Sequence, residues 1–158
     1  MNTTAAVVRA RIPYARALVL ALTLAFAVLA PLESASAGPA DDASAAAWLV
    51  NQTRAEHGLS GLTPDYELQV LANRQANRMA ESGSIFHTSN LGSRLSWGWQ
   101  RWAENVGYGP SVDWVHDAFM NSWSHASNIL DPWHNYVGVG VAYGGDGNVY
   151  VVHVFGTW

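Results

Sequence analysis

The sequence contains no cysteine and no lysine. Without cysteine the chain cannot form disulfide bonds, so an exported domain of this sequence has to be held together by its hydrophobic core alone. That favours a bacterial rather than an animal setting. Eight tryptophans supply large apolar side chains for such a core.

Positive charge is scarce as well. The 158 residues carry eight basic and twelve acidic side chains. An acidic surface does not bind a phosphate backbone by releasing counterions, so nucleic acid is not an expected partner. Anionic membranes should repel such a surface too.

The N-terminal region has the pattern of a secretory signal peptide. Three arginines precede an apolar run at residues 17–32, and the small residues Ala35-Ser36-Ala37 follow it. The run is short for a permanent membrane helix, which needs about 20 residues, although an uncleaved anchor is the alternative. We expect a signal peptide at residues 1–37, an extracellular location and no membrane span after cleavage. Residues 38–158 then carry five arginines and eleven acidic residues, a formal charge of −6, and fit one domain.

A first helix is predicted after a short polar lead at residues 38–44. Residues 44–57 place apolar side chains at helical spacing. Gly58 stands where a helix-ending glycine is expected. We therefore expect the domain to begin at residue 45, within this helix.

Two further helices follow in the pattern. Thr63 has the character of an N-cap and Pro64 that of a first helical residue, and Gly83 ends this second helix. The third helix begins after a Ser111 cap, and its apolar face runs on to Ser122. The stripe thus ends in a hydroxyl group.

The remaining segments predict loops and strands. Residues 84–109 have no helical period and contain one short strand candidate at 103–108. Residues 136–143 alternate valine with glycine or alanine, residues 144–148 have turn chemistry, and residues 149–155 are rich in β-formers. The small residues on one face would let a helix approach closely while the valines pack on the other. The predicted fold is α+β, a three-layer α-β-α sandwich with a central antiparallel sheet.

Six motifs in order resemble a known family. They are LVNQTRAEHGLSGL, TPDYELQVLANRQANRMAESG, Phe86-His87, AENVGYG, MNSWSHASNIL and VGVGVAYGGDGNVYVVHVFG. Their order and spacing resemble the bacterial form of the CAP superfamily, which unites cysteine-rich secretory proteins, antigen 5 and pathogenesis-related 1 proteins. The resemblance implies a CAP domain (SCP-like) at residues 45–158.

The resemblance also implies a cleft with two histidines and two glutamates. Carried over to this sequence, these positions are His87, His125 and Glu104, while the second glutamate falls near Ser122, where this chain departs from the family pattern. We expect these four residues to line one cleft. His87 and His125 are candidate ligands for a weakly held divalent metal such as zinc, and Glu104 would bind it or orient one ring. No cofactor is required, and a structural hydrogen-bond network is the alternative.

Two functions remain open for this cleft. The favoured one is an extracellular recognition domain, a monomer that binds a small apolar molecule or a cell-surface component. The alternative is a hydrolase of peptide, lipid or cell-wall substrates, since Ser122, His125 and Glu104 include a nucleophile, a base and an acid. No nucleophile-elbow motif surrounds Ser122, so no catalytic residue is assigned. A third reading is a metal-modulated structural protein of the cell surface.

The other histidines carry less weight. His57, His116 and His134 have no mutual spacing typical of a metal site, and we expect them at the surface or at helix ends. His153 alternates with apolar residues on one strand face, which places it either in the core or in the cleft.

Several aromatic and amide residues are also candidates. Trp97, Trp99 and Trp102 would form an aromatic wall for a sugar or an acyl chain, or would pin their long loop to the core. Asn105 and Asn128 are expected to bond backbone groups in turns.

Overall fold

The computed structural model describes residues 38–158 of the chain. The signal peptide expected at residues 1–37 lies outside the described residues. No helix in the described part is both long enough and apolar enough to cross a lipid bilayer.

The first helix, α1 (Pro39–Glu56), begins earlier than the sequence pattern predicts. Pro39 stands in the first turn, where its missing N–H is not needed, and two aspartates place negative charge at the positive end of the helix. The predicted polar lead at residues 38–44 is therefore almost entirely helical. The C-terminal end is as predicted, because Gly58 takes a left-handed conformation with φ of 72°.

Helix α2 (Tyr66–Ser82) begins two residues later than predicted. Its N-cap is Asp65, whose carboxylate accepts a hydrogen bond from the N–H of Leu68 at 3.0 Å. The negative charge faces the positive end of the helix, an interaction that the hydroxyl of Thr63 cannot supply. At the other end the helix stops at Gly83, as predicted, with φ of 63°.

A two-residue strand, β1 (Thr63–Pro64), pairs in parallel with β3 (Tyr136–Tyr143). On either side of Pro64, the N–H groups of Thr63 and Asp65 donate to the carbonyl of Asn135, just before β3, and to that of Val137 in β3, at 2.8 and 3.0 Å. Pro64 itself lies where the ladder needs no donor, so its missing N–H is tolerated. The sheet is thus mixed at this short edge, while its three long strands form the antiparallel sheet that was predicted.

The other strand pairs are antiparallel. Strands β3 and β4 (Val149–Thr157) form the predicted hairpin, and β2 (Arg101–Gly109) pairs with the far side of β4. The strand order is β1-β3-β4-β2, so β2 is an outer edge. The strand candidate at 103–108 is the middle of β2, and the rest of the predicted loop contains one short 3-10 helix, η1 (Leu91–Arg94).

The predicted third helix is two helices, α3 (Val112–Met120) and α4 (Trp123–Ile129). Ser111 caps α3 as predicted, and its side chain accepts from an N–H in the first turn at 3.2 Å. Between the helices, the Asn121 side chain bonds a carbonyl of the last turn of α3 at 2.9 Å. Ser122 becomes the N-cap residue of α4 instead of the end of the α3 stripe, because Asn and Ser compete with the helical backbone for hydrogen bonds.

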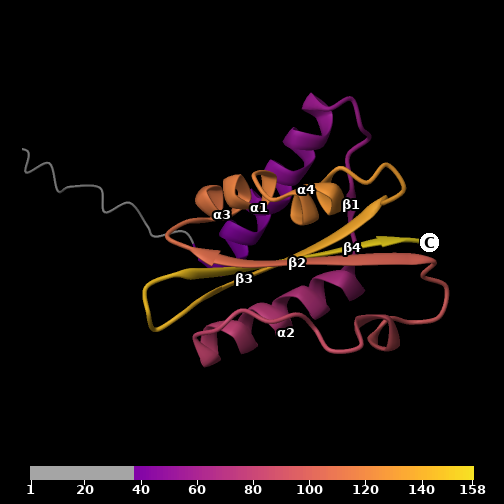
Figure 1. Ribbon diagram of the computed structural model, residues 1–158. Helices are drawn as coiled ribbons and strands as arrows, with labels where there is room; N and C mark the ends of the chain where they lie inside the picture. Colours follow the sequence, from indigo (N-terminus) through magenta and orange to yellow (C-terminus); the bar gives the residue numbers. More distant parts are fainter. Residues whose placement is uncertain (1–37) are drawn as a thin grey trace, which may run out of the picture. The chain divides into compact units, whose positions relative to one another are not determined.

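Figure 1 shows the three layers that were predicted, with α2 on one face of the sheet and α1, α3 and α4 on the other. The glycines of β3 let α2 approach closely. A Cβ added to Gly138 would lie 2.1 Å from a backbone atom of Leu68, and one added to Gly140 would lie 2.3 Å from a backbone atom of Ala72. The valine face of the hairpin packs under the other three helices. The fold is therefore an α+β three-layer sandwich.

Candidate functional site at the outer edge of the sheet

The centre of the site is a hydrogen-bonded pair, His87 and Glu104. The Nδ1 atom of His87 lies 2.8 Å from Oε2 of Glu104, and that oxygen also accepts from the backbone N–H of Thr88 at 2.8 Å. The Thr88 hydroxyl donates to Oε1 at 2.6 Å. The Glu104 side chain is only 5% exposed, whereas that of His87 is 63% exposed. The carboxylate therefore fastens the loop after α2 to edge strand β2, and the ring of His87 stays open to solvent.

His125 lies in the first turn of α4 and has a different partner. Its Nδ1 atom is 2.9 Å from the hydroxyl of Ser122. Partial burial lowers the pKa of His125, and the proximity of His87 lowers it further. The two imidazoles are thus neighbours that interact electrostatically, although no hydrogen bond within the described residues joins them.

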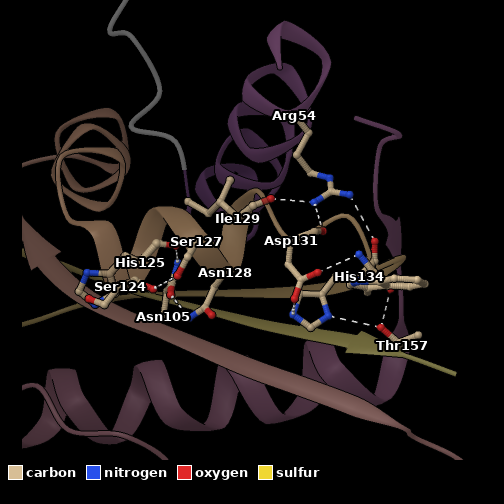
Figure 2. Close-up of polar contacts among 11 residues, drawn as sticks. Arg54, Asn105, Ser124, His125, Ser127, Asn128, Ile129, Asp131, His134 and Thr157 are labelled. Atoms are coloured by element: carbon tan, nitrogen blue, oxygen red, sulfur yellow. Dashed lines mark hydrogen bonds and ion pairs between the residues drawn. The ribbon is translucent and has the colours of Figure 1, made fainter. Parts of the chain in front are cut away.

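Two asparagines fix the position of α4 against β2, as Figure 2 shows. The side-chain amide of Asn105 donates to the carbonyl of His125 at 3.0 Å, and that of Asn128 donates to Oδ1 of Asn105 at 2.9 Å. Asn105 is fully buried in the middle of β2. It bonds a backbone group as predicted, but from a strand and not from a turn.

Arg54 fixes the segment that follows α4. Arg54 is 1% exposed, and its guanidinium donates to the carbonyls of four residues, Ser60, Ile129, Asp131 and His134, at 2.7 to 3.3 Å. Figure 2 shows Arg54 beside the last three of these residues. Burial lowers the pKa of Arg54, and nearby Asp131 raises it in part. Arg54 is not among the residues that the sequence motifs predict for the site. A signal existed, because Arg54 continues the buried stripe of Ala46 and Val50 at four-residue spacing.

His153 belongs to the core and not to the cleft. It is 1% exposed, and its ring packs edge-on against Phe119 and Phe155, with centroid distances of 5.1 and 5.8 Å. Burial lowers the pKa of His153 to about 3, helped by nearby His116 and His125. At neutral pH the ring is therefore uncharged.

The expectation that His116 and His134 lie at the surface or at helix ends is wrong. They are only 7% and 5% exposed, His116 lies in the middle of α3, and His134 lies in the loop between α4 and β3. His116 contacts the Thr53 hydroxyl through Nε2 at 2.8 Å, and His134 stacks on Phe155 at 5.6 Å. Both positions lie where helices or loops pack on the sheet, which a sequence pattern does not reveal. His57 is exposed at the end of α1, as expected.

The predicted aromatic wall divides into two kinds of tryptophan. Trp99 is 8% exposed and packs into the core beneath α2. Trp97 and Trp102 are 97% and 46% exposed, so they do not serve mainly as core anchors. Of the three tryptophans, Trp99 therefore pins the loop to the core as expected, whereas Trp97 and Trp102 remain candidates for ligand contact.

The geometry limits the chemistry of the site. Within residues 38–158, no group of three or more His, Cys, Asp or Glu side chains is arranged to hold a metal ion. Ser122 and His125 are in contact, but the carboxylate of Glu104 bonds His87 instead of His125. The arrangement presents one exposed imidazole held in place by a buried carboxylate, with a second imidazole beside it.

Solved structures of low sequence identity share this fold. An outer surface protein of Borrelia burgdorferi matches with a TM-score of 0.70 at 20% identity, over 77% of this chain and 96% of that one. A cysteine-rich secretory protein of Staphylococcus aureus matches with a TM-score of 0.66 at 23% identity, over 81% of this chain and 40% of that one. An extracellular protein of Bacillus anthracis with an SCP domain matches with 0.66 at 22% identity, over 79% and 45%. The chain thus spans less than half the length of the latter two.

Sequence comparison identifies the family. No curated protein matches the chain at a significant level. The model of the CAP family, described as the cysteine-rich secretory protein family, matches residues 48–155. That match includes the four residues predicted for the site, His87, Glu104, Ser122 and His125, and most of the closing hairpin. The chain belongs to the CAP family.

Proposed function

We propose that the protein is an exported recognition domain that binds its ligand at the outer edge of β2, without catalysing a reaction. His87 and His125 are its contact residues, and the ligand is a small apolar molecule or a cell-surface component. The signal-peptide pattern at residues 1–37 supports export, as do the extracellular and outer-surface proteins among the structural relatives. The domain acts as a monomer.

The observation that carries this proposal is the contrast between Glu104 and His87. Both carboxylate oxygens of Glu104 already accept hydrogen bonds, and the side chain is almost fully buried. Glu104 therefore acts by fixing the ring of His87 and not by touching a ligand. The Nε2 atom of His87 makes no hydrogen bond within the described residues, so it is the ring nitrogen left for a ligand.

We propose further that this site holds a divalent cation such as zinc weakly, with His87 and His125 as its protein ligands. Neutral imidazole is a usual zinc ligand, and zinc takes four ligands in all. The pKa of His125 lies below its ordinary value, so this ring is neutral and able to bind a metal at neutral pH. Two imidazoles leave the other positions to water or to the ligand, which is why binding would be labile.

Hydrolysis of peptide, lipid or cell-wall substrates is the second candidate, favoured by the 2.9 Å contact between Ser122 and His125. In a serine–histidine–acid relay, the acid bonds the ring nitrogen that does not face the serine. Glu104 bonds a different histidine. A relay through His125 therefore lacks its orienting acid, and recognition is the function that this geometry supports better.

Calorimetric titration with zinc chloride at neutral pH tests the role of the two histidines. His87→Ala and His125→Ala should each weaken zinc binding by about tenfold or more, because one remaining imidazole cannot replace two. Glu104→Gln should have a smaller effect, since it keeps the imidazole and loses only part of its orientation.

The matched control is His57→Ala, which removes an exposed histidine at the end of α1 and should leave zinc affinity unchanged. Equal affinity of the wild type and of both site variants would show that His87, Glu104 and His125 form a structural hydrogen-bond network.

A further inference from the structure

A hollow lies where the chain enters β2. It has a volume of about 650 Å³ and is lined by residues 92 and 95–102 apart from Arg101, including Trp97, Trp99 and Trp102. The indole of Trp97 is 97% exposed, and that of Trp102 is 46% exposed. Large aromatic rings left in water beside a hollow mark a binding surface more often than a packing defect.

Two of the three indoles, those of Trp99 and Trp102, are held in place before any ligand arrives. The carboxylate of Glu67 on α2 accepts hydrogen bonds from the Ser96 N–H at 2.6 Å, the Ser96 hydroxyl at 2.7 Å and the Trp99 indole N–H at 2.9 Å. Burial raises the pKa of Glu67, but the hydrogen bonds from Trp99 and Ser96 together outweigh it and lower the pKa. The ring of Trp102 lies against Gly92, where an added Cβ would come within 2.3 Å of it. The part of the aromatic surface made by Trp99 and Trp102 is therefore preorganised.

The lining of this hollow carries no charged side chain. Gln100 lies at its border, and its side-chain amide makes no hydrogen bond within the described residues. A second hollow of about 370 Å³ shares Gln100 and Trp102 and adds Arg101, Asn128 and Asp131. Exposed indoles thus continue into a row of planar hydrogen-bonding groups, which can each donate to or accept from a hydroxyl.

We propose that these two hollows together form a groove that binds an uncharged oligosaccharide. The C–H faces of a pyranose ring carry weak positive charge and pack on the negative face of an indole. Its hydroxyls would bond the amides and charged groups of the adjoining hollow. An acyl chain fits this groove less well, because it would leave Gln100 and its neighbours without partners.

The glycan groove shares no residue with His87, Glu104, Ser122 and His125. It therefore does not depend on the function proposed for those residues. The sugar stacks on indoles, whereas the site at His87 and His125 presents imidazoles. An experiment can therefore disprove glycan binding in the groove without disproving ligand binding at the two histidines, and the reverse.

Tryptophan fluorescence and calorimetry on the purified protein, titrated with cellohexaose and with maltohexaose, test the proposal. At least one of these neutral glucans should bind, and Trp97→Ala should weaken that binding by about tenfold through the lost stacking surface. Trp102→Ala should do the same, and Trp102→Phe, which keeps an aromatic ring against Gly92, should restore most of the affinity. Because Trp97 is almost fully exposed, its replacement should leave the unfolding transition unchanged.

Two controls separate this groove from other surfaces. Trp48→Ala removes a tryptophan that is 62% exposed on α1, across the sheet from α2, and should not change glucan affinity. His87→Ala should not change it either. The proposal is overturned if neither glucan binds, if Trp97→Ala binds as well as the wild type, or if the protein sediments instead with phosphatidylcholine vesicles in a manner that requires Trp97.

Discussion

The imidazole of His153 is buried without charge between two aromatic rings. Its Nδ1 atom, like that of His116, is buried and has no hydrogen-bond partner in the described part of the chain. His116 on α3 and His125 on α4 are the titratable groups that act on it. Protonation of His153 would therefore place a charge in an apolar layer beside two other imidazoles.

Stability should consequently fall as the pH falls. The pKa of His153 drops from its ordinary value of 6.5 to about 3 on folding. Between these two values the unfolded chain binds a proton at His153 that the folded chain does not, so acid favours the unfolded state. This residue alone should lower the free energy of unfolding by about 2 to 3 kcal/mol between pH 7 and pH 4.5, measured by urea denaturation.

His153→Leu is the variant that isolates this effect. Leucine has a similar volume and does not titrate, so the variant should lose less stability between pH 7 and pH 4.5 than the wild type does. Equal losses in the two proteins would mean that other groups cause the acid sensitivity. His57→Ala, at an exposed site, should behave as the wild type.

Among the elements, α1 and the segment after α4 depend on each other through Arg54. Four backbone carbonyls take the place of a carboxylate partner. One of them, that of Ser60, follows α1 directly, and the other three belong to the last residue of α4 and the segment after it. The contact holds the C-terminal end of α4, the helix whose first turn carries His125.

Arg54→Ala should destabilise the protein strongly. It leaves several buried carbonyls without a donor, which should lower the free energy of unfolding by about 3 to 5 kcal/mol. Arg54→Lys should fall between this variant and the wild type, because an ammonium cannot reproduce the fork of a guanidinium. Urea denaturation at pH 7 measures all three, and Arg74→Ala, on the exposed side of α2, should lie within about 0.5 kcal/mol of the wild type. Similar stabilities of the Arg54→Ala and Arg74→Ala proteins would contradict the assignment.

At the scale of the whole molecule, the sandwich depends on how closely α2 can approach the sheet. The hairpin strand β3 presents valines to the layer of α1 and α3, and glycines to α2. Helix backbone thus lies directly on strand backbone, with no side chain between them at Gly138 and Gly140.

Gly140→Ala should therefore force the two layers apart. Its Cβ would meet the backbone of Ala72, which cannot rotate away as a side chain can, so we expect a loss of about 3 kcal/mol or more in the free energy of unfolding. Gly145→Ala is the matched control in the turn between β3 and β4, where an added Cβ meets nothing within 4 Å. Thermal unfolding should show a large decrease in Tm for the first variant and little change for the second. If the two variants had the same Tm, the close packing of α2 on β3 would be disproved.

Local chemistry determined much of this fold. The hydrophobic period and the glycines at positions 58 and 83 located the ends of two helices, and the alternation at residues 136–143 located a strand with one small-residue face. These signals lie within a few residues of one another, so the chain alone specifies an α+β sandwich. The predicted helix ends were wrong where two nearby residues could each serve as the cap. At the start of α2 the sequence predicts Thr63 as the N-cap, and the structure has Asp65.

Only the tertiary structure decided how distant segments meet. The sequence supplied His87, Glu104 and His125 as candidates, but pairing β2 with β4 and packing α4 over β2 determined that Glu104 bonds His87 and not His125. Tertiary packing likewise buried Trp99 and left Trp97 exposed to solvent, although both residues lie in one loop. Such outcomes depend on contacts between residues far apart in the chain. The local sequence around a residue does not indicate which distant residue it will contact.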